Sequence, residues 1–532
     1  MAHPGSLIRQ AAERRPLGAA ADKPQSPLRE LFAPPDLLLT CGGDTRIDID
    51  PATGCNAYGC SPSPAPEIPS FASCTASTIS PRGYEAVKRA RDALMSSAML
   101  HGLVECFDAR IEAMRDELKA LLGVPQPGAE IVFTSSGTDA QLVALGLTRA
   151  LLGDHLVTVV AGADQTGTGT AFTAHGQHFA ARSACGVAAT RGAPINGLGP
   201  VHSVKLRLRD AGGRLCSPSS VDAETLEMVE SAVAQGARVM LEAMDCSKLG
   251  YAAPGDRCLD EIAARWPGRV QIVIDACQAR LGSQRLASYL DRGFMVLLTG
   301  SKFFGGPAFS GAVLVPPQLV GPIGALPRLA PGLAAYLGRS DWPLRWQALR
   351  AQFPAQPNFG EWLRWEAALE EIRAYAAVPV PFRRDIIRKL GDGLAGLISA
   401  SPSARLLPPQ SRAANADEFA LPTIFAFTLH RGGSTLSLAE CRALHHALAH
   451  GTAGHAACLL GQPVGWGGRG DDKEAALRLC ISAGHVVDSY ADPAVPDRIL
   501  TDAASALTTL ETLLRQPSLF PDNNAAKERH VH

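Results

Sequence analysis

The sequence predicts an α/β protein with a large domain built on a mostly parallel sheet and a smaller C-terminal α+β domain. Three observations lead to this prediction. Between about residues 80 and 340, short apolar runs of strand length alternate with stretches of helical periodicity. At Val378-Pro379-Val380-Pro381 the alternating prolines end any helix, and a different composition follows. With 532 residues the chain also exceeds the size of one hydrophobic core, so two domains are expected.

Residues 1–70 are expected to form an irregular extension rich in proline and glycine. Pro34-Pro35 and four further prolines between residues 62 and 69 interrupt any periodic pattern. The first residues hold no apolar core of a signal peptide, so the segment is interpreted as an ordinary extension. The large domain is placed at residues 71–340, and its leading helical pattern spans residues 83–122 and stops at Gly123-Val124-Pro125.

The strands of the large domain are short apolar runs. The first, residues 130–134, is followed by the turn Ser135-Ser136-Gly137-Thr138 and by a helix over residues 139–151. Strands separated by helical stretches indicate a mostly parallel sheet. The further strands are expected at residues 156–160, 238–241, 270–274, 294–298 and 311–315.

The C-terminal part divides into three segments. Residues 341–380 are expected to be a helical linker, residues 381–515 the small domain, and residues 516–532 a disordered polar tail. In the small domain, Ser437 and Glu440 are spaced as a capping box at the start of a helix over residues 438–449. The other expected elements are helices over residues 382–398 and 496–514 and strands over residues 423–429 and 477–482.

Composition argues against several classes of protein. A formal net charge of −1 gives no reason to expect nucleic acid or an anionic membrane as a partner. No apolar run approaches the roughly 18 residues of a membrane span. The thirteen cysteines are scattered and form no Cys-x-x-Cys pair, which argues against a zinc site and against a small secreted disulfide scaffold. We therefore expect no metal site and a cytoplasmic location.

Lys302 is the most informative residue of the chain. It lies in Thr299-Gly300-Ser301-Lys302-Phe303-Phe304, where an apolar strand leads into a turn of small residues. Its apolar neighbours are expected to desolvate the amine, which favours imine formation, although a snorkelling lysine at a strand end fits the pattern too. An earlier apolar strand ends in Asp275. A lysine that forms a Schiff base and an acid that keeps a pyridine nitrogen protonated are what a pyridoxal 5'-phosphate (PLP) site requires.

Two further segments complete the candidate site. Ser136-Gly137-Thr138 lies between a strand and a helix, where small residues let backbone N–H groups approach a phosphate; the same residues also fit a plain N-cap. Arg478 alternates with apolar residues on a strand, and its guanidinium suits a substrate carboxylate, although a surface arginine fits equally well. Gln278 follows Asp275 by three residues and is placed to reach a ring hydroxyl, while Asp275 alone also fits a helix cap.

The order and spacing of these segments resemble the fold-type I PLP-dependent enzymes, particularly the class V aminotransferase and cysteine desulfurase group. The resemblance covers roughly residues 80–510 and implies a seven-stranded sheet and a homodimer, with Gly305-Gly306-Pro307 near the neighbouring subunit. It implies that Asp275 pairs with the ring nitrogen, Gln278 contacts the ring oxygen, and Arg478 binds the substrate carboxylate. The residues that it assigns to the phosphate are Ser136, Gly137, Thr138, Thr299 and Ser301.

The chain departs from that group at two places. Ser301 stands before the lysine where the group has a histidine. The window in which the group places a ring-stacking aromatic or histidine holds neither, so Thr166 is the candidate there, with His175 and His178 as alternatives further on. Another strand end offers Asp245, Ser247 and Lys248 as polar site residues. Lys248 also competes for the Schiff base, but it precedes Asp275, against the order in the group.

The sequence favours a PLP-dependent enzyme that acts on an amino acid, with transamination as the first choice. The alternative is lyase or cysteine desulfurase chemistry, which cleaves a C–S bond. A desulfurase needs a reactive cysteine, and Cys458 is the only candidate by position, although its apolar neighbours indicate a buried thiol. A third reading is a scaffold that binds PLP without catalysis.

Overall fold

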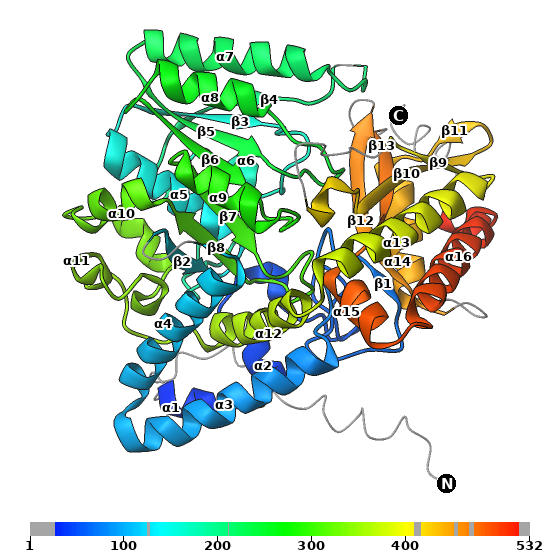
Figure 1. Cartoon of the computed structure of the whole chain (residues 1–532), viewed down its shortest axis with the longest axis horizontal. Helices are drawn as coiled ribbons and strands as arrows, with labels where there is room; N and C mark the ends of the chain where they lie inside the picture. The colour runs from blue at the N-terminus through cyan, green and yellow to red at the C-terminus, as the bar shows by residue number, and fades with distance from the viewer. Residues whose placement is uncertain are drawn as a thin grey trace, which may run out of the picture.

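The computed structural model describes residues 27–124, 128–210, 212–408, 417–451, 456–467 and 473–520. A large α/β part, green and cyan in Figure 1, stands beside a smaller part coloured yellow to red. Two predicted segments, most of the polar tail and the start of the N-terminal extension, lie outside the described residues. Within the described residues, no helix combines the length and the apolar character needed to cross a bilayer.

The large part is organised around one seven-stranded sheet, as the sequence predicts. Its strand order is β2-β8-β7-β6-β5-β3-β4, and only β8 runs antiparallel to its neighbours. The other strands therefore end at a common edge, which in open α/β sheets is where ligands bind. The strands are β2 (Glu130–Thr134), β3 (Leu156–Ala161), β4 (His202–Leu206), β5 (Arg238–Met244), β6 (Val270–Asp275), β7 (Met295–Thr299) and β8 (Gly311–Val315).

The sheet separates two hydrophobic cores because successive side chains of a strand face opposite sides. In β2, Ile131 and Phe133 belong to one core and Val132 to the other. Helix α5 (Gly137–Leu152) packs in the second core, whereas α7 (Pro218–Ala234), α8 (Asp256–Arg265) and α9 (Ser283–Asp291) pack in the first. The remaining helices of this part are α6 (Thr170–Thr173), α10 (Pro317–Gly324) and α11 (Gln347–Arg350).

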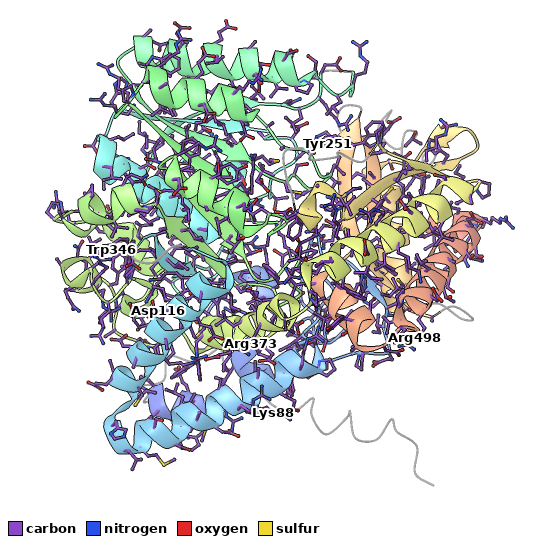
Figure 2. All side chains as sticks on the ribbon, in the orientation of Figure 1. Lys88, Asp116, Tyr251, Trp346, Arg373 and Arg498 are labelled. Atoms are coloured by element: carbon purple, nitrogen blue, oxygen red, sulfur yellow. The ribbon has the colours of Figure 1, made fainter. Side chains whose placement is uncertain are left out.

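The prediction of one leading helix over residues 83–122 is wrong in one respect, because this segment forms two helices. They are α3 (Pro81–His101) and α4 (Leu103–Leu121), which meet at Gly102 with φ 87°. Both pack against the buried helix α12 (Phe359–Ala376), and the ion pair between Arg373 of α12 and Glu117 of α4 braces this junction (Figure 2).

The N-terminal extension contains more regular structure than its prolines suggest. Helices α1 (Pro27–Leu31) and α2 (Pro35–Leu39) lie within it, and Pro35 occupies the first turn of α2, where a missing N–H costs nothing. A 3₁₀ turn at Thr45–Ile47 and strand β1 (Ser70–Phe71) follow. Strand β1 pairs in parallel with β12 of the smaller part, so the extension joins the two parts.

The smaller part is a sheet of order β1-β12-β13-β10-β11, with β9 beside β10, and it is covered by helices (Figure 1). Ser437 and Glu440 form the predicted capping box, whereas β12 was not predicted. The domain boundaries themselves remain predictions. The elements are β9 (Ala404–Leu406), β10 (Ile424–Arg431), β11 (Ser434–Thr435), β12 (Leu459–Gly467), β13 (Glu474–Cys480), α13 (Val380–Ala400), α14 (Leu438–His450), α15 (Ala483–Ala491) and α16 (Val495–Leu514).

The break at Gly102 can be tested with a pair of glycine-to-alanine variants. Gly102→Ala is expected to cost about 1–2 kcal/mol, because a side chain at φ 87° is strained. Gly396 lies inside α13, and a Cβ added there meets no other atom, so Gly396→Ala is expected to stabilise by up to about 1 kcal/mol. Thermal unfolding followed by circular dichroism measures both shifts. If both variants had a lower Tm than the wild type, or both a higher one, the assignment of a strained break at Gly102 would be contradicted.

Candidate functional site

A cavity of about 860 Å³ lies where the common edge of the seven-stranded sheet faces the smaller part. Four separate stretches of sequence meet there, as the sequence analysis expects. The predicted residues that line it are Ser136, Gly137, Thr138, Asp275, Thr299, Ser301, Lys302 and Arg478.

Lys302 projects from a rigid turn. After β7 ends at Thr299, the backbone N–H of Gly300 donates to Ser310 O at 2.9 Å, and that of Gly306 donates to Gly300 O at 3.0 Å. A Cβ on either glycine would approach Ala368 Cβ of α12 within 2.7 Å, so α12 requires a bare backbone here. No hydrogen bond to the Lys302 Nζ is recorded among the described residues. The amine therefore faces the cavity on a fixed backbone and is free to react.

Asp275 stands on the neighbouring strand end. It closes β6, which pairs in parallel with β7, and Asp275 lies opposite Leu297. Its Oδ1 accepts a hydrogen bond of 3.0 Å from the backbone N–H of Cys277. This contact fixes the carboxylate at the cavity wall beside the turn that carries Lys302.

The turn from Ser136 to Thr138 is both a helix cap and a cavity wall. Ser136 Oγ accepts from the backbone N–H of Asp139 at 3.3 Å, so the N-cap interpretation is confirmed. Helix α5 begins at Gly137, where a Cβ would lie 2.7 Å from Cys277 Sγ and 3.2 Å from Thr299 Cγ2. The bare first turn thus presents backbone N–H groups and the positive end of a helix dipole to the cavity, which suits an anion.

Arg478 is buried, so the surface-arginine alternative is wrong; only 1% of its surface is exposed. Nη1 donates to Lys248 O at 3.2 Å, and Nη2 donates to Thr75 Oγ1 at 3.2 Å and to Gln462 O. Nε has no partner, and no carboxylate pairs with this guanidinium among the described residues. A buried cation without a counter-ion is costly, and an anionic ligand would offset that cost.

Of the three polar residues after β5, only Lys248 lines the cavity. Ser247 Oγ donates to Gln165 at 2.7 Å, and Asp245 accepts from Tyr289 at 3.0 Å, so both are engaged elsewhere. Burial, reinforced by repulsion from Arg478 and Lys302, lowers the pKa of Lys248 to about 7. A second lysine with a readily removed proton therefore faces the same space as Lys302.

Four further candidates, besides Asp245 and Ser247, do not line the cavity. The Gln278 amide donates to Cys74 O at 3.0 Å, and its Oε1 accepts from Arg280 at 2.8 Å, so this buried arginine holds it away. Thr166 Oγ1 turns back to Ala163 O at 3.3 Å. The two histidines that were alternatives for ring stacking, His175 and His178, contact Val201 O and the Tyr336 hydroxyl.

Sequence reasoning missed two walls of the cavity. The N-terminal extension supplies Arg46 and Tyr58 to one of them, and the segment directly after it supplies Cys74 and Thr75. Helix α14 supplies the other with Arg442, His445, His446 and His450. No local pattern marks the first group, because its role depends on contacts with residues some 90 positions away.

Beneath the cavity lies a buried carboxyl group. Gln141, which lines the cavity, donates through Nε2 to Glu242 Oε1 at 2.7 Å. Burial, together with the nearby charge of Asp275, raises the pKa of Glu242 to about 8. Glu242 is therefore mostly protonated at neutral pH.

Comparison with solved structures shows which fold this is. An Oryza sativa protein described as TDC with PLP and tryptamine aligns with TM-score 0.51 and 14% identity, over 94% of this chain and 92% of that chain. A structure described as a NifS-like protein aligns with TM-score 0.50 and 14% identity, over 83% and 99% of the two chains. No family model and no curated protein matches the sequence. The likeness confirms the predicted fold, that of the fold-type I PLP-dependent enzymes.

Because Glu242 is protonated in the folded state, it should make the free energy of unfolding depend on pH. Its folded pKa lies above the unfolded value, so the folded state holds a proton that the unfolded state has released. Stability should therefore fall between about pH 5 and pH 8, by up to about 1.4 kcal/mol per unit from this group. In Glu242→Gln this part of the slope should vanish in urea unfolding measured at several pH values. Glu227→Gln on the exposed face of α7 is the control, and an equal change of slope in both variants would contradict the assignment.

Proposed function

We propose that this chain is a PLP-dependent enzyme that acts on an amino acid, with Lys302 as the residue to which the cofactor attaches. The observation that carries the proposal is that one cavity joins a lysine amine, a strand-end carboxylate, a helix N-terminus and a buried arginine with no carboxylate partner among the described residues. The fold agrees, and the Oryza sativa neighbour is described with PLP bound.

The residues present fit the cofactor. The start of α5 at Gly137 and the hydroxyl residues Ser136, Thr138 and Ser301 line the cavity, and Arg478 Nε lacks a partner among the described residues. The cavity of about 860 Å³ is large enough for a cofactor and a small substrate together. The Ser136–Thr138 turn, Thr299 and Ser301 would hold the phosphate, and Asp275 would hold the protonated pyridine nitrogen.

Bound PLP supplies an electron sink that stabilises negative charge at the substrate α-carbon. The chain itself supplies the placement and the proton transfers. Lys302 Nζ would hold the cofactor, and the same amine would take the α-proton of the substrate and return it to another atom. Arg478 binds the substrate carboxylate, and this contact determines which bond at the α-carbon is oriented for cleavage. Gln278 is given no part in this scheme, because Arg280 and Cys74 already bind its amide.

Among the possible reactions, transamination is our first choice. It requires one mobile base that transfers a proton between two carbons, and the unpaired amine of Lys302 meets this requirement. Cys458, the cysteine first considered for sulfur transfer, is unsuited to that role. It does not line the cavity, and burial raises its pKa to about 12. The complete set of lysine, acid and arginine also argues against a scaffold without catalysis.

One observation keeps a cysteine desulfurase or lyase as the second candidate. Cys74 lines the cavity beside Arg478 and Lys248. Burial opposes ionisation, but a hydrogen bond from Cys480 and the charges of Arg478 and Arg280 lower the pKa of Cys74 below its usual value. A thiolate in this position is suited to accept the sulfur of a cysteine substrate.

We extend the proposal to a homodimer, on the strength of the resemblance alone. Gly305 has φ 83°, and a Cβ added there meets no atom of its own chain. The turn therefore leaves room for a second copy, and a cytoplasmic location belongs to the same proposal.

The attachment site is tested by comparing two lysines of the same cavity. Wild-type protein mixed with PLP and freed of excess should show an absorbance band at about 420 nm from lysine-bound cofactor. Lys302→Ala should lose the band, and Lys248→Ala should keep it at saturating PLP. A band that persists without Lys302 and disappears without Lys248 would contradict the assignment, and wild-type protein that never binds PLP would overturn the proposal.

The reaction is tested with PLP-loaded protein and single amino acids, one turnover at a time. Transamination should move the absorbance to about 330 nm and release a 2-oxo acid. Without that shift, a desulfurase should release alanine and leave a persulfide that an added thiol reduces to sulfide, and a lyase should release pyruvate, ammonia and sulfide together. Arg478→Ala should raise the half-saturating amino-acid concentration by about 30-fold or more, because a buried partner of the carboxylate is lost. Sulfide release that disappears in Cys74→Ser would favour the second candidate, and an unchanged half-saturating concentration would exclude the role of Arg478.

A further inference from the structure

The N-terminal extension places one cation against the wall that the proposed function assigns to the phosphate. Arg46 Nη1 donates to Thr138 Oγ1 at 3.4 Å, and its Nη2 donates to Ser136 Oγ at 3.5 Å. Both contacts are long, so neither hydroxyl is tightly bound to the guanidinium. Arg46 itself lines the cavity, and 27% of its side chain remains accessible.

Asp44 fixes the plane of this guanidinium. Arg46 Nε and Nη2 donate to the two carboxylate oxygens of Asp44 at 2.9 and 2.6 Å. The same carboxylate caps the 3₁₀ turn by accepting from the Arg46 backbone N–H at 2.9 Å. Because this bidentate pair occupies the Nε edge, the other side of the guanidinium remains for further acceptors; Nη1 makes the long contact to Thr138, and the Tyr58 hydroxyl also interacts with the guanidinium.

Aromatic rings hold the guanidinium from the sides. The Arg46 Cζ atom lies 5.3 Å from the centre of the Phe179 ring and 5.2 Å from that of Phe309. A guanidinium held by two rings and a bidentate carboxylate loses little further freedom when it binds an anion. The arrangement is that of a preorganised donor.

Apart from Arg46, the described residues that form this wall include no cation other than Lys302. Its members are hydroxyls and backbone N–H groups of the Ser136–Thr138 turn, together with Thr299 and Ser301. Ser301 stands where the resembling group has a histidine, and Lys302 is committed to the covalent attachment. A phosphate, with close to two negative charges, would thus meet only partial positive charges without Arg46.

We propose that Arg46 is a cofactor-binding residue that donates to the phosphate of PLP across the hydroxyls of Ser136 and Thr138, so that the N-terminal extension completes the cofactor site. This inference rests on the proposed function and adds a residue to it that lies outside the four motifs. It also gives a role to a segment that contributes no strand to the seven-stranded sheet.

One neighbouring charge opposes the phosphate and has to be weighed. Asp139 lies one residue beyond Thr138 and accepts from the Ser136 hydroxyl at 2.5 Å. Burial and the charge of Asp44 raise the pKa of Asp139 to about 7, so it is half-protonated at neutral pH. Arg46 and Asp44 offset each other's charge in their ion pair, so Arg46 would act on the phosphate chiefly through the directed N–H groups of Nη1.

The test compares two ligands that differ only in the phosphate. PLP and pyridoxal are titrated into the full-length protein, and Kd is measured from quenching of the tryptophan fluorescence. Arg46→Gln should raise the Kd for PLP about tenfold or more, the loss expected for one charge-assisted hydrogen bond, and should change the Kd for pyridoxal by less than about twofold. The double variant Asp44→Asn/Arg46→Gln should show the same changes in the two Kd values as Arg46→Gln. It serves as a check because it also removes the carboxylate that the single variant leaves unpaired.

Arg182→Gln is the matched control. Arg182 anchors the same segment by donating to Asp44 O at 3.3 Å and by its ion pair with Asp48, but it does not line the cavity. Arg182→Gln should leave the Kd values for PLP and pyridoxal within about twofold of those of the wild type. If Arg46→Gln weakens PLP and pyridoxal equally, or weakens neither, the inference is overturned while the proposed function stands. If wild-type protein binds neither ligand, the proposed function is overturned and the inference with it.

Discussion

The buried guanidinium of Arg364 on α12 holds the wall of the cavity that comes from the N-terminal extension. Its Nε donates to Phe309 O at 2.8 Å. Its two terminal nitrogens donate to the carbonyl oxygens of residues 39, 41 and 42 at 3.0, 2.6 and 2.7 Å. A lysine, with a single nitrogen, could not reach all of these carbonyls at once. The chain leaves this clamp at Gly42, with φ 61°, and arrives at Arg46 over the cavity.

A second constraint sets the distance across the cavity. Lys302 belongs to the large part and Arg478 to the smaller one, so their separation depends on how the parts pack. A small core that includes Tyr251, Val464 and Ala476 joins them, and Figure 2 shows Tyr251 in this region. Arg209 adds to this contact, because its guanidinium lies 4.7 Å from the Trp466 ring centre and donates to the Tyr251 hydroxyl at 3.3 Å. The Arg478 contact with Lys248 O crosses the same boundary.

The sequence predicted those features that depend on local pattern. Buried parallel strands are continuous apolar runs, and a polar residue at the end of such a run marks the functional edge; Asp275 and Lys302 were found in this way. Strand β12 was missed because Leu459–Gly467 contains three glycines and a proline, and it becomes a strand only between β1 and β13. Edge strand β4 was missed because its side chains are largely polar or exposed. Arg46 could not be predicted, because contacts with residues distant in sequence, those of Arg364 and Arg182 among them, bring it to the site.

The most direct test of the central claim is to locate the covalent bond between protein and cofactor. Borohydride reduces the C=N bond of a lysine-bound cofactor and makes the attachment permanent, so digestion and mass spectrometry can identify the modified peptide. The structure predicts one pyridoxyl group per chain on Lys302, because its amine is unpaired beside Asp275. Stoichiometric modification of Lys248, or modification spread over surface lysines alone, would contradict the account.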